Sequence, residues 1–227
     1  INIENLIGSG FNDRLDGDNN ANSLEGGAGA DSLYGYGGND TLSGGAGNDI
    51  LDGSTDTDTA SFATATGAIT ALLWNGTATG DGSDTLTSIE NLIGSGFNDR
   101  LDGTNTANSL EGGAGADSLY GYDGNDTLVG GAGDDLLTGG GGSDTFRYGA
   151  STNGVDTIAD LTLGDTILVE AALGTATAGD GSAVTGKNVQ VSSSGGVTTL
   201  WIDTNNAAGA EVQINLTGTF AANTLAV

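Results

Sequence analysis

A period of nine residues constrains this chain more than any other feature. Glycine recurs at every ninth position from Gly8 to Gly53 and from Gly94 to Gly139, and leucine does so from Leu6 to Leu51 and from Leu92 to Leu137. A third register carries oxygen-bearing side chains: Asp13, Asn22, Asp31, Asp40, Asp49 and Asp58, then Asp99, Asn108, Asp117, Asp126, Asp135 and Asp144. Such a short repeat predicts a stack of similar coils.

The nonamers lie within a larger duplication. Residues 3–53 match residues 89–139 at an offset of 86, with 44 of 51 positions identical. The offset is not a multiple of nine, so the segment between the copies breaks the phase. Because Ile1 is not a start methionine, we expect a piece of a longer, tandemly repeated protein or a processed product. We expect four regions: β-roll blocks at 1–60 and 89–147, a β linker at 61–88, and a C-terminal β capping or secretion-signal region at 148–227.

The composition excludes several classes of function. The chain has 30 acidic residues against 4 Lys and Arg, a formal net charge of −26, and no His or Cys. Disulfides, thiolate or imidazole metal sites and histidine-dependent catalysis are therefore excluded, and nucleic acid is a poor partner for so acidic a surface. No apolar run is long enough to span a membrane. No serine has a base to activate it, so we expect no enzyme activity.

Elementary geometry predicts how one nonamer folds. The sequence G-G-x-G-x-D suits a turn with positive φ angles, and the three residues that follow, such as Ser32-Leu33-Tyr34, suit a short strand with its leucine pointing inward. Two nonamers then make one coil of eighteen residues with two strands. Stacked turns bring Asp side chains together, and their repulsion favours a hard divalent cation with oxygen ligands, for which calcium is the best candidate.

Three nonamers carry a resemblance to a known family: GGAGADSLY at 26–34, GGAGNDILD at 44–52 and GGAGDDLLT at 130–138. They match G-G-x-G-x-D-x-U-x, where U is a large aliphatic residue, and the chain thus resembles the RTX (repeats-in-toxin) family over about residues 6–60 and 92–147. The fold class that this implies is all-β: two tandem parallel β-rolls (a calcium β-helix with 18 residues per coil) joined by a short β linker, with a C-terminal β cap.

The resemblance also implies where calcium binds. Each ion would lie between two turns one coil apart, held by the carbonyls at positions 2 and 4 and the Asp of one turn, and by the carbonyls at positions 1 and 3 and the Asp of the next. In the first block the implied ligand residues are Asp13, Asn22, Gly26, Gly27, Ala28, Gly29, Asp31, Gly35, Tyr36, Gly37, Gly38, Asp40, Gly44, Ala46, Asp49, Gly53, Thr55 and Asp58. In the second block they are Asp99, Asn108, Gly112, Gly113, Ala114, Gly115, Asp117, Gly121, Tyr122, Asp123, Gly124, Asp126, Gly130, Ala132, Asp135, Gly139, Gly141 and Asp144.

Pairing of these turns gives about four sites per block, or about eight Ca²⁺ ions in all. Sites that contain Asn22 or Asn108 should be weaker, since an amide oxygen adds no charge. The turns at 8–13 and 94–99 also depart from the pattern, with Phe11 and Phe97 at position 4. An EF-hand is excluded, because its loop of alternating acidic residues is absent.

The sequence predicts β structure in the segments outside the nonamers. In the linker we expect a strand from Ile69 to Trp74, a turn at Asp81-Gly82, and Phe62 and Trp74 in a capping core. Near the C-terminus, alternating patterns predict strands at Val189–Val191, Val197–Ile202 and Val212–Leu216. Residues 156–169 (DTIADLTLGDTILV) resemble the segment that follows the repeats in many RTX proteins, and the uncharged tail Phe220 to Val227 is typical of a type I secretion signal or a terminal β cap.

Together these features predict a non-enzymatic, extracellular calcium-binding module. The first hypothesis is part of a surface-layer, filament or adhesin-type RTX protein that is secreted to the bacterial cell surface by the type I machinery. Calcium would drive its folding, and it could self-assemble into a lattice or filament. The alternative is the C-terminal secretion and folding module of a secreted lipase, protease or epimerase. Neither hypothesis includes a nucleic acid partner or a membrane span.

Overall fold

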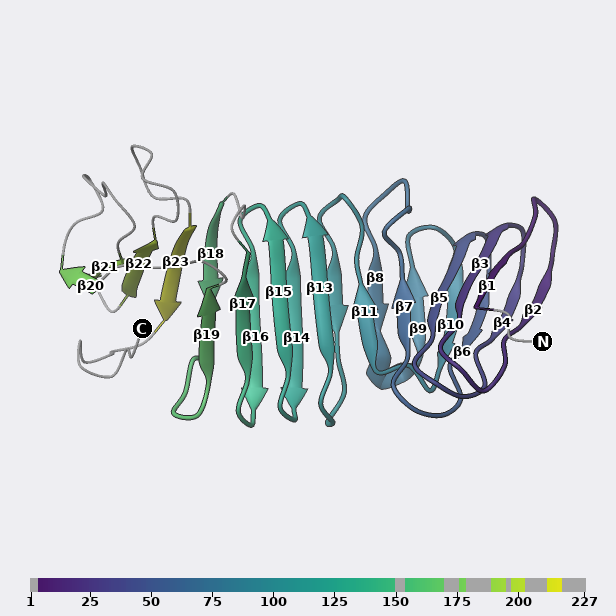
Figure 1. Cartoon of the computed structure of the whole chain (residues 1–227). Coiled ribbons are helices and arrows are strands. Elements are labelled where there is room, and N and C mark those ends of the chain that lie inside the picture. Colours follow the sequence, from purple (N-terminus) through teal and green to yellow (C-terminus); the bar gives the residue numbers. More distant parts are fainter. Residues whose placement is uncertain are drawn as a thin grey trace.

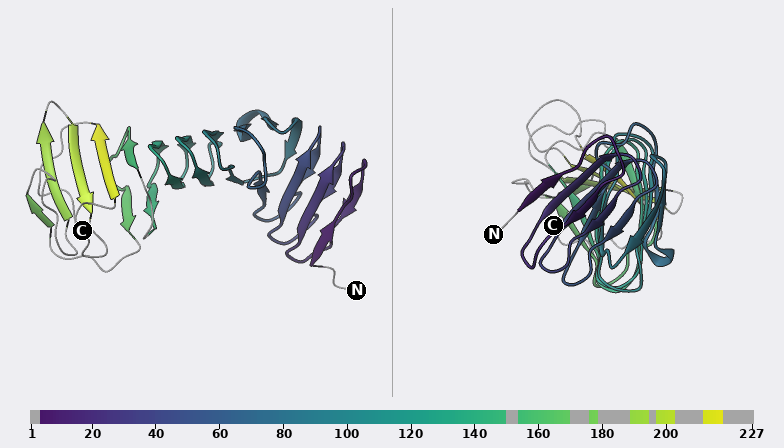
Figure 2. Two further views of the ribbon diagram at one scale, coloured as in Figure 1. Left: turned by 90° about the horizontal axis from the view of Figure 1, so that it is seen from above. Right: turned by 90° about the vertical axis from the view of Figure 1, so that its right-hand side faces the viewer.

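The chain winds into a solenoid whose two sheets face each other across a narrow core (Figures 1 and 2). The structure is a computed structural model, and it describes residues 4–149, 154–169, 176–178, 189–194, 197–202 and 212–217. Within these ranges it is almost entirely β, with one 3₁₀-helix, η1 (Leu73–Asn75). No helix in the described residues has the length and apolar character to cross a membrane.

The first sheet is parallel and runs through both blocks of repeats. Its nine strands are, in spatial order, β1 (Asn5–Ile7), β3 (Ser23–Ala28), β5 (Thr41–Ala46), β7 (Thr59–Ser61), β11 (Asn91–Ile93), β13 (Ser109–Ala114), β15 (Thr127–Ala132), β17 (Thr145–Tyr148) and β19 (Thr166–Val169). Strand β7 of the first block pairs directly with β11 of the second, so the two blocks share this sheet.

The second sheet contains the linker and the C-terminal strands. Its order is β2 (Arg14–Asp16), β4 (Ser32–Tyr34), β6 (Ile50–Asp52), β10 (Ser83–Thr87), β9 (Thr77–Thr79), β8 (Thr70–Leu72), β12 (Arg100–Asp102), β14 (Ser118–Asp123), β16 (Leu136–Gly141), β18 (Val155–Ile158), β23 (Val212–Thr217), β22 (Val197–Ile202), β21 (Val189–Ser194) and β20 (Ala176–Ala178). The linker strands β8, β9 and β10 form an antiparallel meander between β6 and β12. Strands β21 to β23 form the antiparallel part of the C-terminal cap.

The nine-residue period produces this arrangement because strands eighteen residues apart pair in register. Leu24 lies opposite Leu42 in the first sheet, and Leu33 lies opposite Leu51 in the second. The core is therefore a double row of leucines with at most 1% of their surface exposed: Leu24, Leu33, Leu42, Leu51, Leu92, Leu101, Leu110, Leu119, Leu128 and Leu137. The all-β fold with eighteen residues per coil, expected from the sequence, is confirmed.

Glycine is required where the turns of successive coils touch. Gly45 has a φ of +90°, and a Cβ on it would collide with the carbonyl oxygen of Gly27 one coil earlier. Gly47 stands in the same relation to Gly29. Because L residues rarely adopt such φ angles, the glycines allow the turns to stack as closely as the strands do.

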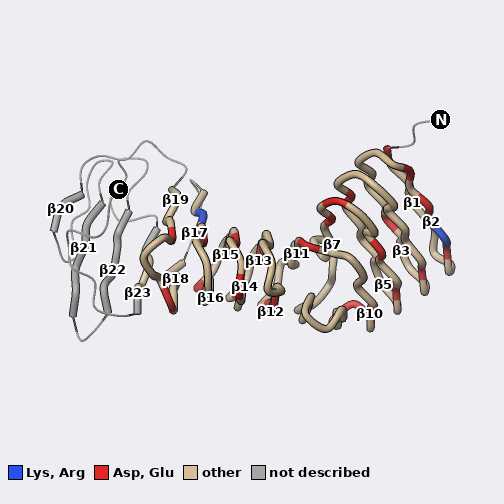
Figure 3. The backbone as a smooth tube through the Cα atoms, turned by 90° about the horizontal axis from the view of Figure 1, so that it is seen from below, with Lys and Arg blue, Asp and Glu red and all other residues tan. Residues whose placement is uncertain are grey.

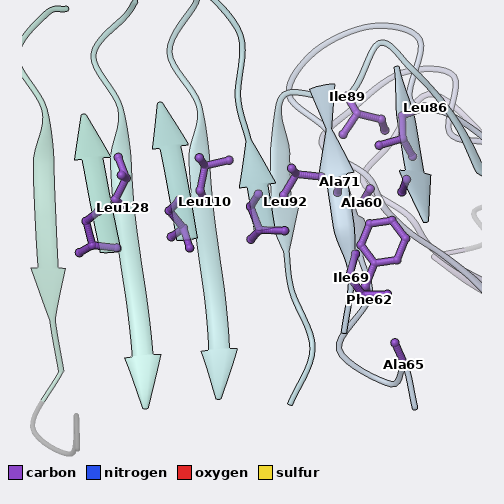
Figure 4. Packing of buried hydrophobic residues seen from close by; sticks show 14 of the residues in the cluster. Ala60, Phe62, Ala65, Ile69, Ala71, Leu86, Ile89, Leu92, Leu110 and Leu128 are labelled. Carbon is purple, nitrogen blue, oxygen red and sulfur yellow. The ribbon is translucent and has the colours of Figure 1, made fainter. Parts of the chain in front are cut away.

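The linker confirms some expectations and corrects one. The predicted strand at 69–74 is β8, and the predicted turn at Asp81-Gly82 lies between β9 and β10. Phe62 is buried in a cluster with Ala60, which occupies a leucine position of the core (Figure 4). Trp74, however, is 59% exposed, so its expected place in the core is wrong. The reason is local: Trp74 lies on η1, where the chain reverses between β8 and β9.

In the C-terminal region the three predicted strands are confirmed as β21, β22 and β23. Residues 156–169 contribute β18 and β19, which extend the two sheets of the solenoid by one strand each. The tail from 220 to 227 lies outside the described residues.

Candidate metal centre

The Asp register of the sequence forms two columns of side chains, one along each line of turns, and all members except Asp13 are buried. Figure 3 shows acidic residues (red) recurring from coil to coil along the backbone. In each column a side chain accepts a hydrogen bond from the backbone of the equivalent residue one coil earlier. The N–H of Asp31 donates to Oδ1 of Asp49 at 2.8 Å, and the N–H of Asp117 donates to Oδ1 of Asp135 at 2.9 Å. The same bond joins Asp13 to Asp31, Asn22 to Asp40, Asp40 to Asp58, Asp99 to Asp117, Asn108 to Asp126 and Asp126 to Asp144.

The second carboxylate oxygen of these side chains has no partner. Among the described residues, Oδ2 is buried and without a hydrogen bond in Asp31, Asp40, Asp49, Asp58, Asp117, Asp126, Asp135 and Asp144. Each of these residues has at most 2% of its surface exposed. A buried anion without a partner is costly, and eight of them in register indicate a ligand that the protein atoms do not supply.

Four of the unpartnered oxygens, those of Asp31, Asp58, Asp117 and Asp126, lie beside a position 1 glycine that also faces a backbone carbonyl of the next coil. A Cβ on Gly26 would overlap Asp31 Oδ2 and would lie 2.6 Å from the carbonyl oxygen of Gly44. Gly112 stands in the same way between Asp117 Oδ2 and the Gly130 carbonyl. The missing side chain of the position 1 glycine therefore leaves room where oxygens from two turns converge.

These oxygens fit a calcium ion. The described residues contain no group of three or more Asp, Glu, His or Cys side chains that could hold a metal, so any cation here needs backbone carbonyls as well. Two carboxylates and several carbonyls form a hard, all-oxygen donor set, which calcium accepts with irregular geometry, while zinc prefers nitrogen or sulfur. The structure thus brings together the turn of Gly27, Gly29 and Asp31 and the turn of Gly44, Ala46 and Asp49, as the sequence predicted.

Some of the carbonyls expected as ligands also accept backbone hydrogen bonds. The Gly29 N–H donates to the Ala46 oxygen at 2.8 Å, and the Gly115 N–H donates to the Ala132 oxygen at 2.7 Å. The carbonyls of Tyr36 and Gly141 accept similar bonds. A carbonyl oxygen has two lone pairs, so these bonds leave one for a cation.

Burial raises the pKa of the column carboxyls. It raises the pKa of Asp58, Asp126 and Asp135 to about 6 and that of Asp117 to about 7, because the charged form loses its hydration. The negative charges of Asp135 and Asp99 contribute further to the shift at Asp117. Without a cation, the fold therefore opposes ionisation of the groups that the sequence places in the columns.

Four column residues satisfy their side chains in another way. Oδ2 of Asp13 accepts from the backbone and hydroxyl of Ser9, and Oδ2 of Asp99 accepts from the backbone of Ser95. The Oδ1 atoms of Asn22 and Asn108 accept from N–H groups within their own turns, at 2.7 Å in both cases. These members lie in the columns as predicted, but each of these oxygens already accepts a hydrogen bond from its own turn.

The columns also contain residues that sequence reasoning missed. Asp84 and Glu90 continue them through the linker, and Asp156 and Asp165 continue them past the second block. The signal was present in weakened form: Gly80, Gly82, Asp84 and Leu86 occupy positions 2, 4, 6 and 8 of a nonamer. Asp156 and Asp165 likewise precede an aliphatic residue by two positions and lie nine residues apart, but twelve residues separate Asp144 from Asp156, so the phase of the second block is lost.

Comparison with known proteins finds similar solved structures and a matching family. No curated protein is similar enough to count as a relative. One solved structure, the R3 subunit of the mannuronan C5-epimerase AlgE6 from Azotobacter vinelandii, is 38% identical over 55% of this chain and 72% of the other, with a TM-score of 0.40. Another, the extracellular lipase LipA from Serratia marcescens, is 19% identical with a TM-score of 0.39; the match covers 98% of this chain but only 38% of the lipase.

The family comparison covers more than half of the chain. The RTX calcium-binding nonapeptide repeat matches in four copies, at residues 2–33, 25–60, 93–128 and 120–155. These segments contain all eight aspartates whose Oδ2 atom is unpartnered. The chain therefore belongs to the family of proteins with RTX calcium-binding nonapeptide repeats, and its repeats form a calcium-binding β-roll.

Proposed function

We propose that this chain is an extracellular structural module that folds when it binds calcium, as part of a surface-layer, filament or adhesin-type protein. The observation that carries the proposal is the set of eight buried, unpartnered Oδ2 atoms in the two columns. When the chain folds without a cation, the ionised carboxylates lose their hydration and the fold is destabilised. With calcium between the turns, ion–oxygen contacts replace the lost hydration.

The whole-chain charge supports the same reading. About eight calcium ions, about four in each block as expected from the spacing, would add about 16 positive charges. They would change the net charge from −26 to about −10, a value ordinary for a soluble domain of this size. Before it meets calcium, the chain's own repulsion favours the unfolded state, which suits passage through a type I secretion channel.

The proposed role is not catalytic. The chain has no His or Cys, and the carboxylates in the columns are bound to backbone N–H groups of neighbouring coils. Such groups hold turns together and are poorly placed to move protons to and from a substrate.

A second candidate is the secretion and folding module of a larger secreted enzyme. It is favoured by residues 156–169, which resemble the segment after the repeats in many RTX proteins and extend both sheets. The reading frame of the parent gene separates the two: further 86-residue copies favour a surface or filament protein, and a hydrolase or epimerase domain favours the second.

Circular dichroism during a calcium titration tests the calcium-driven folding. We expect a disordered spectrum in excess chelator and a β spectrum as calcium approaches millimolar concentration, since binding free energy becomes folding free energy. A complete β spectrum in chelator would contradict the proposal. Electron microscopy with calcium then tests assembly, and monodisperse particles under all conditions would count against a lattice or filament.

A further inference from the structure

The junction between the two blocks carries column residues of its own. Residues 61–92 lie outside the segments that match the family repeat. Even so, both Asp columns cross this region, through Asp84 on one line of turns and Glu90 on the other. Each of these residues takes the place that an Asp one coil later holds elsewhere in the solenoid.

Asp84 stands one coil beyond Asp49, although 35 residues separate them. The N–H of Asp49 donates to Asp84 Oδ1 at 3.0 Å, and the strands that follow pair Leu51 with Leu86. The turn before Asp84 is equivalent too, because the Gly47 N–H donates to the Asp81 carbonyl at 3.0 Å, as Gly29 does to Ala46. Asp84 is 5% exposed, and Asp49, with its unpartnered Oδ2, is 1% exposed.

Glu90 holds the equivalent place beyond Asp58. The Asp58 N–H donates to Glu90 Oε2 at 2.9 Å, and Asp58 is fully buried with an unpartnered Oδ2. A Cβ on Gly53 would overlap both Asp58 Oδ2 and the Ser88 carbonyl oxygen. This is the arrangement of Asp31 Oδ2 and the Gly44 carbonyl around Gly26, so carboxylate and carbonyl oxygens converge here as well.

The use of glutamate has a geometric reason. Thr87 lies opposite Asp52 in the sheet, and the first block needs six residues from Asp52 to reach its column residue Asp58. The junction turn has only three residues from Thr87 to Glu90, and its Ser88 has a φ of +50°. The extra methylene of glutamate carries the carboxylate across the distance that the shortened turn leaves.

We propose that the junction binds two calcium ions of its own, one between the turns of Asp49 and Asp84 and one between the turns of Asp58 and Glu90. The shortened turn at Ser88 offers fewer carbonyls than a full nonamer, so water completes the shell of the second ion and that ion binds more weakly than those within the blocks. The two ions tie the last coil of the first block to the linker and make the blocks one stack. This inference rests on the proposed calcium-dependent folding.

Calcium counting by native mass spectrometry and equilibrium dialysis tests the proposal. The variant carries Asp84→Asn and Glu90→Gln, which keep an oxygen acceptor for the N–H groups of Asp49 and Asp58 but remove two charges. The control carries Glu25→Gln and Glu111→Gln, which remove the same charge from exposed strand positions outside the columns. We expect the control to match the unchanged protein and the variant to lose two ions or to bind two of them at least tenfold more weakly.

The outcomes separate this inference from the proposed function. If the unchanged protein binds calcium and the variant binds as many ions with the same affinities, the junction sites are refuted while the calcium-driven folding stands. If the unchanged protein binds no calcium, both fail. If the double variant does not fold in calcium, the ions bound by the single variants Asp84→Asn and Glu90→Gln are counted separately. Each single variant must then lose one ion or bind one ion more weakly; otherwise the inference is refuted.

Discussion

Removal of one column charge should change the stability of the fold in opposite directions with and without calcium. The perturbation is Asp117→Asn, which keeps an acceptor for the Asp99 N–H but removes the buried charge. Asp117 is 1% exposed and its Oδ2 has no partner. The sign of the effect therefore depends on whether a cation is present to bind that oxygen.

The magnitude follows from the pKa of Asp117, which burial and the neighbouring Asp135 raise from 3.8 to about 7. Because the folded pKa is the higher one, the ion-free fold is favoured most when the group is protonated, and it loses stability as the pH rises from about 4 to about 7. A rise of about three units corresponds to about 4 kcal/mol, which water near the turns reduces to about 2 kcal/mol. Above pH 7, the variant should gain about this much in chelator.

In calcium the same change removes a charged ligand and should weaken binding about tenfold or more, a loss of at least about 1.4 kcal/mol. The assay is folding followed by circular dichroism, induced by trimethylamine N-oxide in chelator and reversed by urea in saturating calcium. Glu111→Gln, on an exposed strand position, is the control for net charge. A variant that is less stable than the unchanged protein in chelator, or equally stable in calcium, would refute the reasoning.

Three further predictions follow from the columns and the turns. Asp31→Ala should weaken calcium-dependent folding more than Asp16→Ala, because Asp16 lies outside the columns in an exposed ion pair with Arg14; equal effects in a calcium titration would argue against the assigned positions. Apparent calcium affinity, measured by calorimetry, should fall between pH 7.5 and 5.5, because calcium must displace protons from carboxyls with pKa values of about 6 to 7; a pH-independent affinity would oppose this. Gly45→Ala should cost about 2–4 kcal/mol in urea unfolding, since its φ is +90° and the new Cβ meets the Gly27 carbonyl, whereas Gly10→Ala, with no atom within 4 Å, should be close to neutral.

The regular part of the fold and of the candidate site could be predicted because the nine-residue period determines both the leucine core and the positions of the column residues. Leucine every nine residues places Leu24 against Leu42 and Leu33 against Leu51, and the same interval places Asp31 one coil before Asp49. Once the coil has eighteen residues, both the core and the columns follow.

What could not be predicted depends on contacts that break this interval. The hydroxyl of Ser9 donates a hydrogen bond to Asp13 in a turn that lacks the position 2 glycine. The nine-residue period does not predict this bond. Trp74 was expected in a capping core of the linker, but it lies on η1 and is exposed. Asp84 and Glu90 were missed because the linker changes the spacing between successive column residues. Strand pairing nevertheless keeps β10 in register with β6 and β11 in register with β7.

A crystal structure determined with calcium tests the central claim most directly. Ions are predicted between stacked turns, each about 2.3–2.6 Å from an aspartate Oδ2 that has no partner among the protein atoms. Asp31 Oδ2 beside the Gly44 carbonyl and Asp117 Oδ2 beside the Gly130 carbonyl are the clearest positions to inspect. Calcium at these oxygens would confirm the account, and columns whose Oδ2 atoms bind only water or protons in saturating calcium would contradict it.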